Sequence, residues 1–148
     1  MMKRLLLAAA LGLSACAGPQ GPSTVTATDA WCRPTPNGAR TGACYLSLTA
    51  SADDRLVGAA SSRASEVQIH EMTTENGVMR MGELAGGLPL SQGLAASLRP
   101  GGVHLMLIGL NVPLVAGETA PLTLRFDNAP EITVQARIRQ PSAHDMAH

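Results

Sequence analysis

From Thr24 onward the chain alternates short apolar runs with turn-forming residues, and we find no window with the apolar period of an amphipathic helix. Runs of this length and spacing are typical of strands in a β-sandwich. The pattern predicts nine strands, at residues 24–33, 43–50, 56–61, 66–71, 78–83, 95–99, 104–108, 121–127 and 131–138. We therefore expect a single all-β domain over residues 24–140.

Two turn motifs arrange the middle of this domain. Asn76-Gly77 supplies the positive φ angles of a tight hairpin, so the predicted strands on either side of it should pair antiparallel. Pro100-Gly101-Gly102 marks another turn, directly before the strand at 104–108. Residues 141–148 carry no apolar period, which predicts a flexible tail.

The N-terminus has the pattern of an export signal, with two positive charges, an apolar run at 5–13 and small residues after it. The run is too short to span a bilayer as a stable helix. Leu13-Ser14-Ala15-Cys16 resembles the bacterial lipobox, which predicts a lipoprotein signal peptide at 1–15 and lipidation of Cys16. The alternative is ordinary cleavage after Ala17. Either route predicts export to the periplasm or cell envelope, with residues 16–23 as a tether and membrane contact through the lipid anchor alone.

Composition narrows the function further. The chain has three aromatic residues, no basic patch and no lysine beyond the leader, which argues against nucleic-acid binding, P-loop phosphate binding and Schiff-base chemistry. No arrangement of serine, histidine and acid for nucleophilic catalysis is evident, and the histidines do not resemble a zinc hydrolase. We expect a protein that is not an enzyme.

Cys32 and Cys44 flank a turn-rich stretch between two predicted strands. Outside the cytoplasm such a pair can form a disulfide. The alternative is two free thiols that act as metal ligands. The absence of C-x-x-C spacing favours the disulfide.

The histidines carry the strongest chemical signal. Three of the four stand two residues before a methionine: His70-Glu71-Met72, His104-Leu105-Met106 and His144-Asp145-Met146. On a β-strand, residues i and i+2 project from the same face, so each pair can present a nitrogen and a sulfur together. Thioether sulfur selects Cu(I), and imidazole binds copper in either oxidation state. The pattern therefore predicts a copper site.

The simplest main site has two imidazoles and two thioethers, which would hold Cu(I): His70, Met81, His104 and Met106. Met72 and Met79 are secondary candidates, and because Met79 and Met81 share a strand face, the sequence leaves the choice between them open. The alternative for each methionine is core filling.

The tail contains a further set of donors, His144, Met146 and His148, which predicts a second, weaker site for Cu(II) with help from Asp145. The alternative is a solvated tail without metal.

Three segments, at 67–72, 77–81 and 100–107, resemble the periplasmic copper chaperones called PCuAC, and shorter matches at 31–34, 43–46 and 121–126 extend the resemblance over residues 24–138. The family motif is a histidine, ten residues, a methionine, twenty-one residues and then H-x-M. The gap from His70 to Met81 fits, but the second gap holds one residue more, which we place in the loop at 85–93. Cys32 and Cys44 also depart from the small residues expected there.

The resemblance implies a cupredoxin-like Greek-key β-sandwich that binds Cu(I). It also implies delivery of copper to the CuA centre of cytochrome c oxidase subunit II, or to another copper chaperone, and uptake of Cu(II) by the tail. Two alternatives stay open. A blue-copper electron carrier needs a cysteine thiolate near its other ligands, and no cysteine lies between His70 and Met106. A metal-free structural lipoprotein of the envelope is the other alternative.

Overall fold

The computed structural model describes residues 21–147. The predicted signal peptide, the lipidation site Cys16 and the tail residue His148 lie outside the described residues, and the tether at 16–23 is described only in its last three residues. Ten strands and one helical turn make up the described part: β1 (Val25–Cys32), β2 (Thr41–Ala50), β3 (Asp54–Ala60), β4 (Ala64–Glu75), β5 (Val78–Glu83), β6 (Leu88–Leu90), β7 (Ala95–Leu98), β8 (His104–Leu110), β9 (Thr119–Phe126), β10 (Ile132–Ile138) and α1 (Ala143–Met146).

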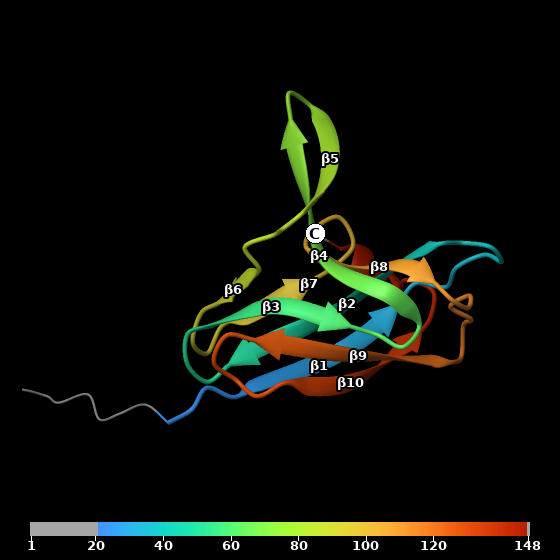
Figure 1. The fold of residues 1–148 in the computed structure, drawn as a ribbon. Coiled ribbons are helices and arrows are strands. Elements are labelled where there is room, and N and C mark those ends of the chain that lie inside the picture. Colours follow the sequence, from blue (N-terminus) through green and yellow to red (C-terminus); the bar gives the residue numbers. More distant parts are fainter. Residues whose placement is uncertain (1–20, 148) are drawn as a thin grey trace, which may run out of the picture.

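The strands form a strongly curved sheet with the order β5-β4-β8-β2-β1-β10-β9-β3-β6, while β7 pairs with β2. A further contact between β3 and β4 brings the two ends of this path together. The strands pair antiparallel except β1 and β10, which are parallel. Figure 1 shows the resulting sandwich body, with a hairpin of β4 and β5 rising out of it. The predicted cupredoxin-like all-β fold is confirmed.

Leucine fills the core, as a chain with three aromatic residues requires. Alternate positions along β8 and β9 are fully buried, among them Leu105, Leu107, Leu122 and Leu124. All nine predicted strands are present, and this alternation of buried and exposed positions is what made them recognisable in the sequence. The additional strand β6 has three residues, too few to show a period of two.

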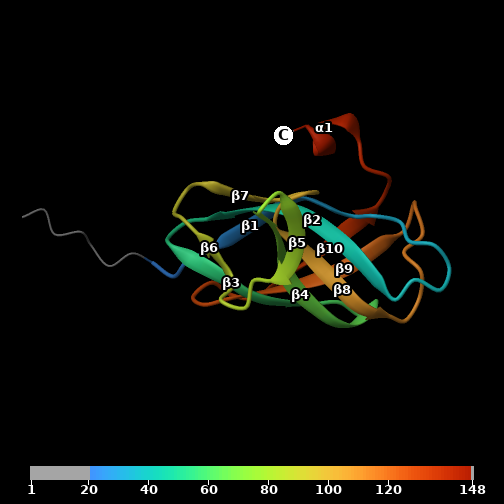
Figure 2. The same cartoon turned by 90° about the horizontal axis from the view of Figure 1, so that it is seen from above.

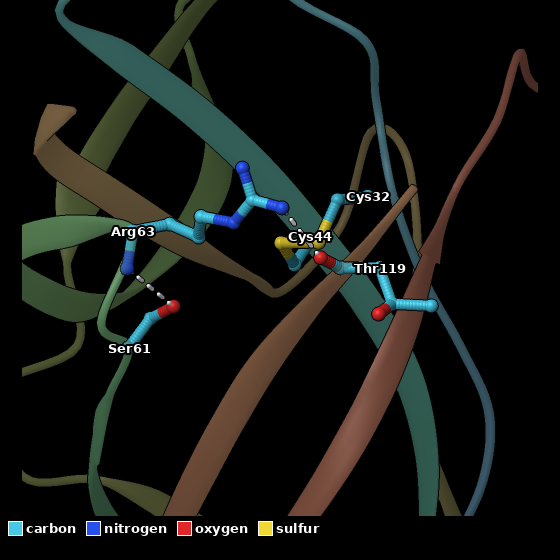
Figure 3. Close-up of a disulfide and its surroundings, with 5 residues drawn as sticks. All are labelled: Cys32, Cys44, Ser61, Arg63 and Thr119. Atoms are coloured by element: carbon cyan, nitrogen blue, oxygen red, sulfur yellow. Dashed lines mark hydrogen bonds between the residues drawn. A yellow bond between two sulfur atoms is a disulfide. The ribbon is translucent and has the colours of Figure 1, made fainter. Parts of the chain in front are cut away.

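The structure contains the predicted disulfide. Cys32 and Cys44 lie directly opposite each other on β1 and β2, their sulfur atoms are 1.98 Å apart, and neither residue is exposed. Figure 3 shows the bond near the extended side chain of Arg63, whose guanidinium donates to the carbonyl of Thr119 and whose backbone N–H donates to Ser61. The alternative of free thiols as copper ligands does not apply to this state of the protein.

The C-terminal segment, predicted as a flexible tail, contains one short element of regular structure. Residues Ala143–Met146 form one helical turn with a capping box, in which Ser142 and Asp145 bond each other's side chains and backbone N–H groups. Arg139 also bonds Asp145, at 2.7 Å. The turn buries none of its residues, so polar contacts hold it and no apolar period marks it in the sequence. Within residues 21–147 no helix is long and apolar enough to cross a membrane.

Candidate metal centre

The hairpin of β4 and β5 starts at His70. The first half of β4, up to His70, pairs with β8 inside the body, whereas residues 71–75 pair with β5 alone above it. We call this projecting part, residues 70–83, the arm. Its tip is the predicted tight turn, with φ of 51° at Asn76 and 77° at Gly77. His70 pairs with both β5 and β8, so it lies where the arm leaves the body.

The two histidines predicted as ligands are neighbours. His70 on β4 lies directly opposite His104 on β8, and the centroids of their rings are 5.9 Å apart. Residues that face each other across an antiparallel pair project from the same side of the sheet. The second predicted turn, at 100–102, comes just before β8, which begins at His104. It thus brings His104 to the end of β8 that pairs with His70.

His104 is fixed by the backbone. Its side chain is buried, with 5% of the residue exposed, and its Nδ1 atom is 3.0 Å from the carbonyl oxygen of Gly102. A carbonyl oxygen can only accept, so Nδ1 carries the hydrogen. The lone pair of the neutral ring is then on Nε2, which is left for a metal.

His70 is fixed by a side chain instead. Its Nε2 atom is 2.7 Å from Oε1 of Gln68, while its Nδ1 atom is buried and has no hydrogen-bond partner. Burial lowers the pKa of His70, and nearby His104 lowers it further, against an opposing effect of Glu83 on β5. The ring is therefore neutral at neutral pH, which is the form that binds a metal.

The candidate methionines share the face of the two histidines. Met106 follows His104 by two residues on β8 and lies opposite Gln68. Met81 lies opposite Met72 on the arm, one alternation away from His70. Met79 is two residues farther along β5, opposite Thr74. The register thus places Met81 nearer to His70 than Met79, although both share one face as predicted.

The exposure of these methionines distinguishes them from methionines that fill a hydrophobic core. Half of Met81 and 59% of Met79 are exposed, and Met72 and Met106 are partly exposed. Core filling, the alternative weighed from the sequence, does not account for apolar side chains that stand in water. Among the described residues, no group of three or more His, Cys, Asp or Glu side chains is arranged to hold a metal ion. A donor set of imidazole and thioether is what this face offers, and that set fits copper.

Aromatic rings continue the same row of the sheet beyond His104. Tyr45 on β2 is 6.3 Å from the His104 ring, and Trp31 on β1 is 4.6 Å from Tyr45, between ring centroids. The guanidinium of Arg139 lies 4.2 Å from the centre of the Trp31 ring. Sequence reasoning missed these aromatic neighbours, because their contacts depend on the register between strands far apart in the chain. It also missed Gln68, which is on the same strand as His70 and contacts it through its side-chain amide.

The tail pair does not join the main site. Figure 2 shows α1 outside the body, on the side of β1, β2 and β7, whereas the arm rises from β4. On a helical turn, residues i and i+2 point in different directions, so His144 and Met146 do not share a face. Met146 instead lies 4.0 Å from a guanidinium nitrogen of Arg33.

Asp145 was expected to help the tail bind Cu(II), but both of its carboxylate oxygens are engaged. Arg139 donates to Oδ1 and Oδ2, and the N–H and hydroxyl of Ser142 donate to Oδ2. In this conformation the carboxylate is not available to a metal.

Comparison with known families and proteins agrees with the sequence resemblance. The model of a family described as LpqE-like lipoproteins matches residues 25–138. A Leifsonia xyli protein named as lipoprotein Lxx21020 is 37% identical over 127 residues, which cover 80% of this chain and 76% of that protein. The uncharacterized protein RP573 of Rickettsia prowazekii is 27% identical over 73% of this chain and 62% of its own length.

Solved structures show the same fold. The apo PCuAC domain of PmoF2 is 26% identical with a TM-score of 0.65, covering 83% of this chain and 95% of that domain. The Cu(I) form of DR1885 from Deinococcus radiodurans is 28% identical with a TM-score of 0.55, covering 84% of this chain and 83% of that protein. A copper-bound PCuAC domain of PmoF2, at 23% identity and a TM-score of 0.65, supports the fold alone. The resemblance to PCuAC proteins is confirmed.

Proposed function

Because the chain belongs to the LpqE-like family of lipoproteins, which is of the PCuAC type, we propose that it is a copper chaperone of the cell envelope. It binds Cu(I) through His70, Met81, His104 and Met106. The observation that carries this proposal is the pairing of His70 and His104 across β4 and β8, with thioethers on the same face. Similarity to the Cu(I) form of DR1885 supports the choice of metal.

The ligand types suit a carrier. Two neutral imidazoles and two thioethers hold Cu(I) without placing a negative charge on it, and they disfavour hard ions. Met81 is half exposed, so an incoming ligand can reach the metal from that side and replace the thioether. His104 is almost fully buried and held by Gly102, so it keeps its place during the exchange.

We propose the CuA centre of cytochrome c oxidase subunit II as the acceptor, with another copper chaperone as the alternative. A CuA site contains thiolates, which are softer and stronger ligands for Cu(I) than thioethers. Transfer of Cu(I) from this site to the acceptor would therefore be favourable in free energy. The family resemblance is what supports this partner.

Residues 21–147 offer no thiolate to the site, because Cys32 and Cys44 are joined in the buried disulfide. This disfavours the blue-copper carrier, which needs a thiolate ligand. The lipoprotein family, and the similarity to a protein named as a lipoprotein, support an envelope location. We propose export by the leader and anchoring through Cys16.

For the tail we propose a second, weaker Cu(II) site formed by His144 and His148, with Met146 at most a minor contributor. Asp145 can join only if its bonds to Arg139 and Ser142 open. Copper(II) titration of the full chain and of a truncation ending at Gln140 tests this site. Equal Cu(II) stoichiometry in both would remove it.

The main proposal is tested by Cu(I) titration of the exported domain against a chromophoric chelator, together with X-ray absorption. We expect one tightly bound Cu(I) with a mixed nitrogen and sulfur shell. His104→Ala should abolish tight binding, while His144→Ala serves as the matched histidine control. A shell without sulfur would overturn the ligand set. No Cu(I) binding by the wild type would favour the metal-free structural lipoprotein.

A further inference from the structure

Three side chains on the outer face of β4 are hydrogen-bonded in series. Nε2 of Gln68 donates to Oε1 of Glu66 at 2.8 Å, and Oε1 of Gln68 lies 2.7 Å from Nε2 of His70. These residues are spaced by two, so all three project from the same side of the strand. The series ends at one of the proposed copper ligands.

The first bond of the series fixes the second. An ionised carboxylate can only accept, so the amide nitrogen of Gln68 must face Glu66. The amide oxygen of Gln68 then faces His70, and since that oxygen can only accept, Nε2 of His70 must carry the hydrogen. Glu66 thus selects the orientation of Gln68, and Gln68 selects the tautomer of His70.

A second, independent observation points to the same atom. With the hydrogen on Nε2, the lone pair of His70 is on Nδ1, and this is the buried nitrogen without a partner. Buried polar atoms are ordinarily hydrogen-bonded, so a lone pair left in this state is a sign of a group kept for a ligand.

We propose that Gln68 is a positioning residue of the copper site, which holds His70 in the tautomer that binds Cu(I) through Nδ1. This inference rests on the proposed function. His104 is held in the opposite tautomer by the carbonyl of Gly102 and binds through Nε2. The two histidines thus use different ring nitrogens, one set by a side chain and the other by the backbone. Partners of this kind orient the imidazole ligands of metal sites in general.

The test starts with the metal-free protein, in which long-range 1H–15N correlation NMR distinguishes the two tautomers of each histidine. We expect His70 as the Nε2–H form and His104 as the Nδ1–H form. Gln68→Met removes the acceptor at nearly constant size and should convert His70 to a mixture of tautomers. Gln68→Glu keeps an oxygen acceptor and should restore the Nε2–H form. Gln135→Met, at an exposed position of β10, is the matched control and should change neither histidine.

Copper affinity is measured on the same variants. Loss of such a positioning partner ordinarily lowers metal affinity roughly 10- to 100-fold, so we expect a loss in this range for Gln68→Met and recovery of most of it in Gln68→Glu. Thermal unfolding of the metal-free variants checks that each is folded.

The outcomes separate the two proposals. A wild-type protein with His70 as the Nδ1–H form overturns the positioning role. So does a Gln68→Met variant with unchanged tautomer and unchanged Cu(I) affinity. In both cases tight Cu(I) binding by the wild type would leave the chaperone proposal standing. Wild-type protein that binds no Cu(I), but shows the expected tautomers, overturns the chaperone proposal and the copper role of Gln68 with it.

Discussion

The same three-residue pattern, histidine then any residue then methionine, occurs on the sheet and on the tail with opposite results. On β4 and β8 the two partners of each pair share one face, and the two histidines also lie opposite each other. On α1 the partners point in different directions, and the residue between them is bound to Arg139. A metal-binding motif in a sequence therefore predicts the relative positions of its donor atoms only once its secondary structure is known.

The two regions also differ in how they are anchored. Beneath the sheet face, the disulfide joins β1 to β2, and leucines pack below it. The tail turn is held by one ion pair, a capping box and the contact of Met146 with Arg33. The sheet face is thus the firmly held region and the tail the weakly attached one, and the following measurements test this difference.

The largest effect is expected at the disulfide. Replacing both cysteines, as Cys32→Ala with Cys44→Ala, should lower the free energy of unfolding by about 3 kcal/mol, since the bond closes a short loop in the unfolded chain. Urea unfolding of the oxidised wild type and of the double variant measures this. Reduced wild type is the control and should resemble the variant. Equal midpoints for all three proteins would show that the sheet does not depend on this anchor.

The next effect is expected at the paired histidines. His104→Ala should weaken Cu(I) binding by about 100-fold or more, equivalent to about 2.7 kcal/mol, because it removes a ligand and not merely its support. His144→Ala should leave Cu(I) affinity unchanged. Competition with a chromophoric Cu(I) chelator gives both values. Equal losses in the two variants would contradict the distinction between sheet and tail.

A smaller effect should separate the two exposed methionines of the arm. Met81→Leu should weaken Cu(I) binding about tenfold, or about 1.4 kcal/mol, because it removes one thioether of four ligands. Met79→Leu is the matched control on the same strand, with similar exposure, and should have no effect. The reverse order would assign the ligand to Met79 and would require the arm to bend toward the body.

The smallest effect is expected at the tail. The hydrogen bonds from Arg139, followed by those from Ser142, hold the pKa of Asp145 well below its usual value of 3.8. The stability that this carboxylate gives to the contact between α1 and Arg139 is therefore complete above the usual pKa of 3.8. It is lost only as the pH falls through the lower pKa of Asp145 in the folded protein. The contact should persist at pH 4 and weaken only in stronger acid.

Asp145→Asn should release the turn at neutral pH at a cost of about 1 kcal/mol, with Cu(I) affinity unchanged. Hydrogen exchange of the Asp145 amide in the wild type, compared with that of residue 145 in the variant, measures this. Retained protection in the variant would mean that other contacts hold the tail.

Much of this structure follows from the sequence alone, for identifiable reasons. The strands were predictable because apolar residues such as Leu105 and Leu107 alternate with outward-facing ones, and the hairpin because Asn76-Gly77 fits a tight turn. The candidate ligands were predictable as residue types. Their mutual placement was not, because the pairing of His70 with His104 depends on the register between β4 and β8, which three other strands separate in the chain.

Side-chain partners within one strand or turn were missed for a different reason, since they depend on how polar side chains are oriented. Gln68 looked like an ordinary outward-facing polar residue, and its role became visible only with the orientation of its amide. The tail turn was missed because its stability comes from Ser142, Asp145 and Arg139 and not from an apolar stripe.

The stacking of Arg139 on Trp31 gives the protein a built-in optical reporter. Trp31 is the sole tryptophan of the chain, so indole fluorescence comes from one place, between Tyr45 and a guanidinium that is itself bound to the tail. Release of Asp145 frees that guanidinium to move, and the emission of Trp31 should change with it. Release of the tail can thus be followed in the unlabelled protein in real time.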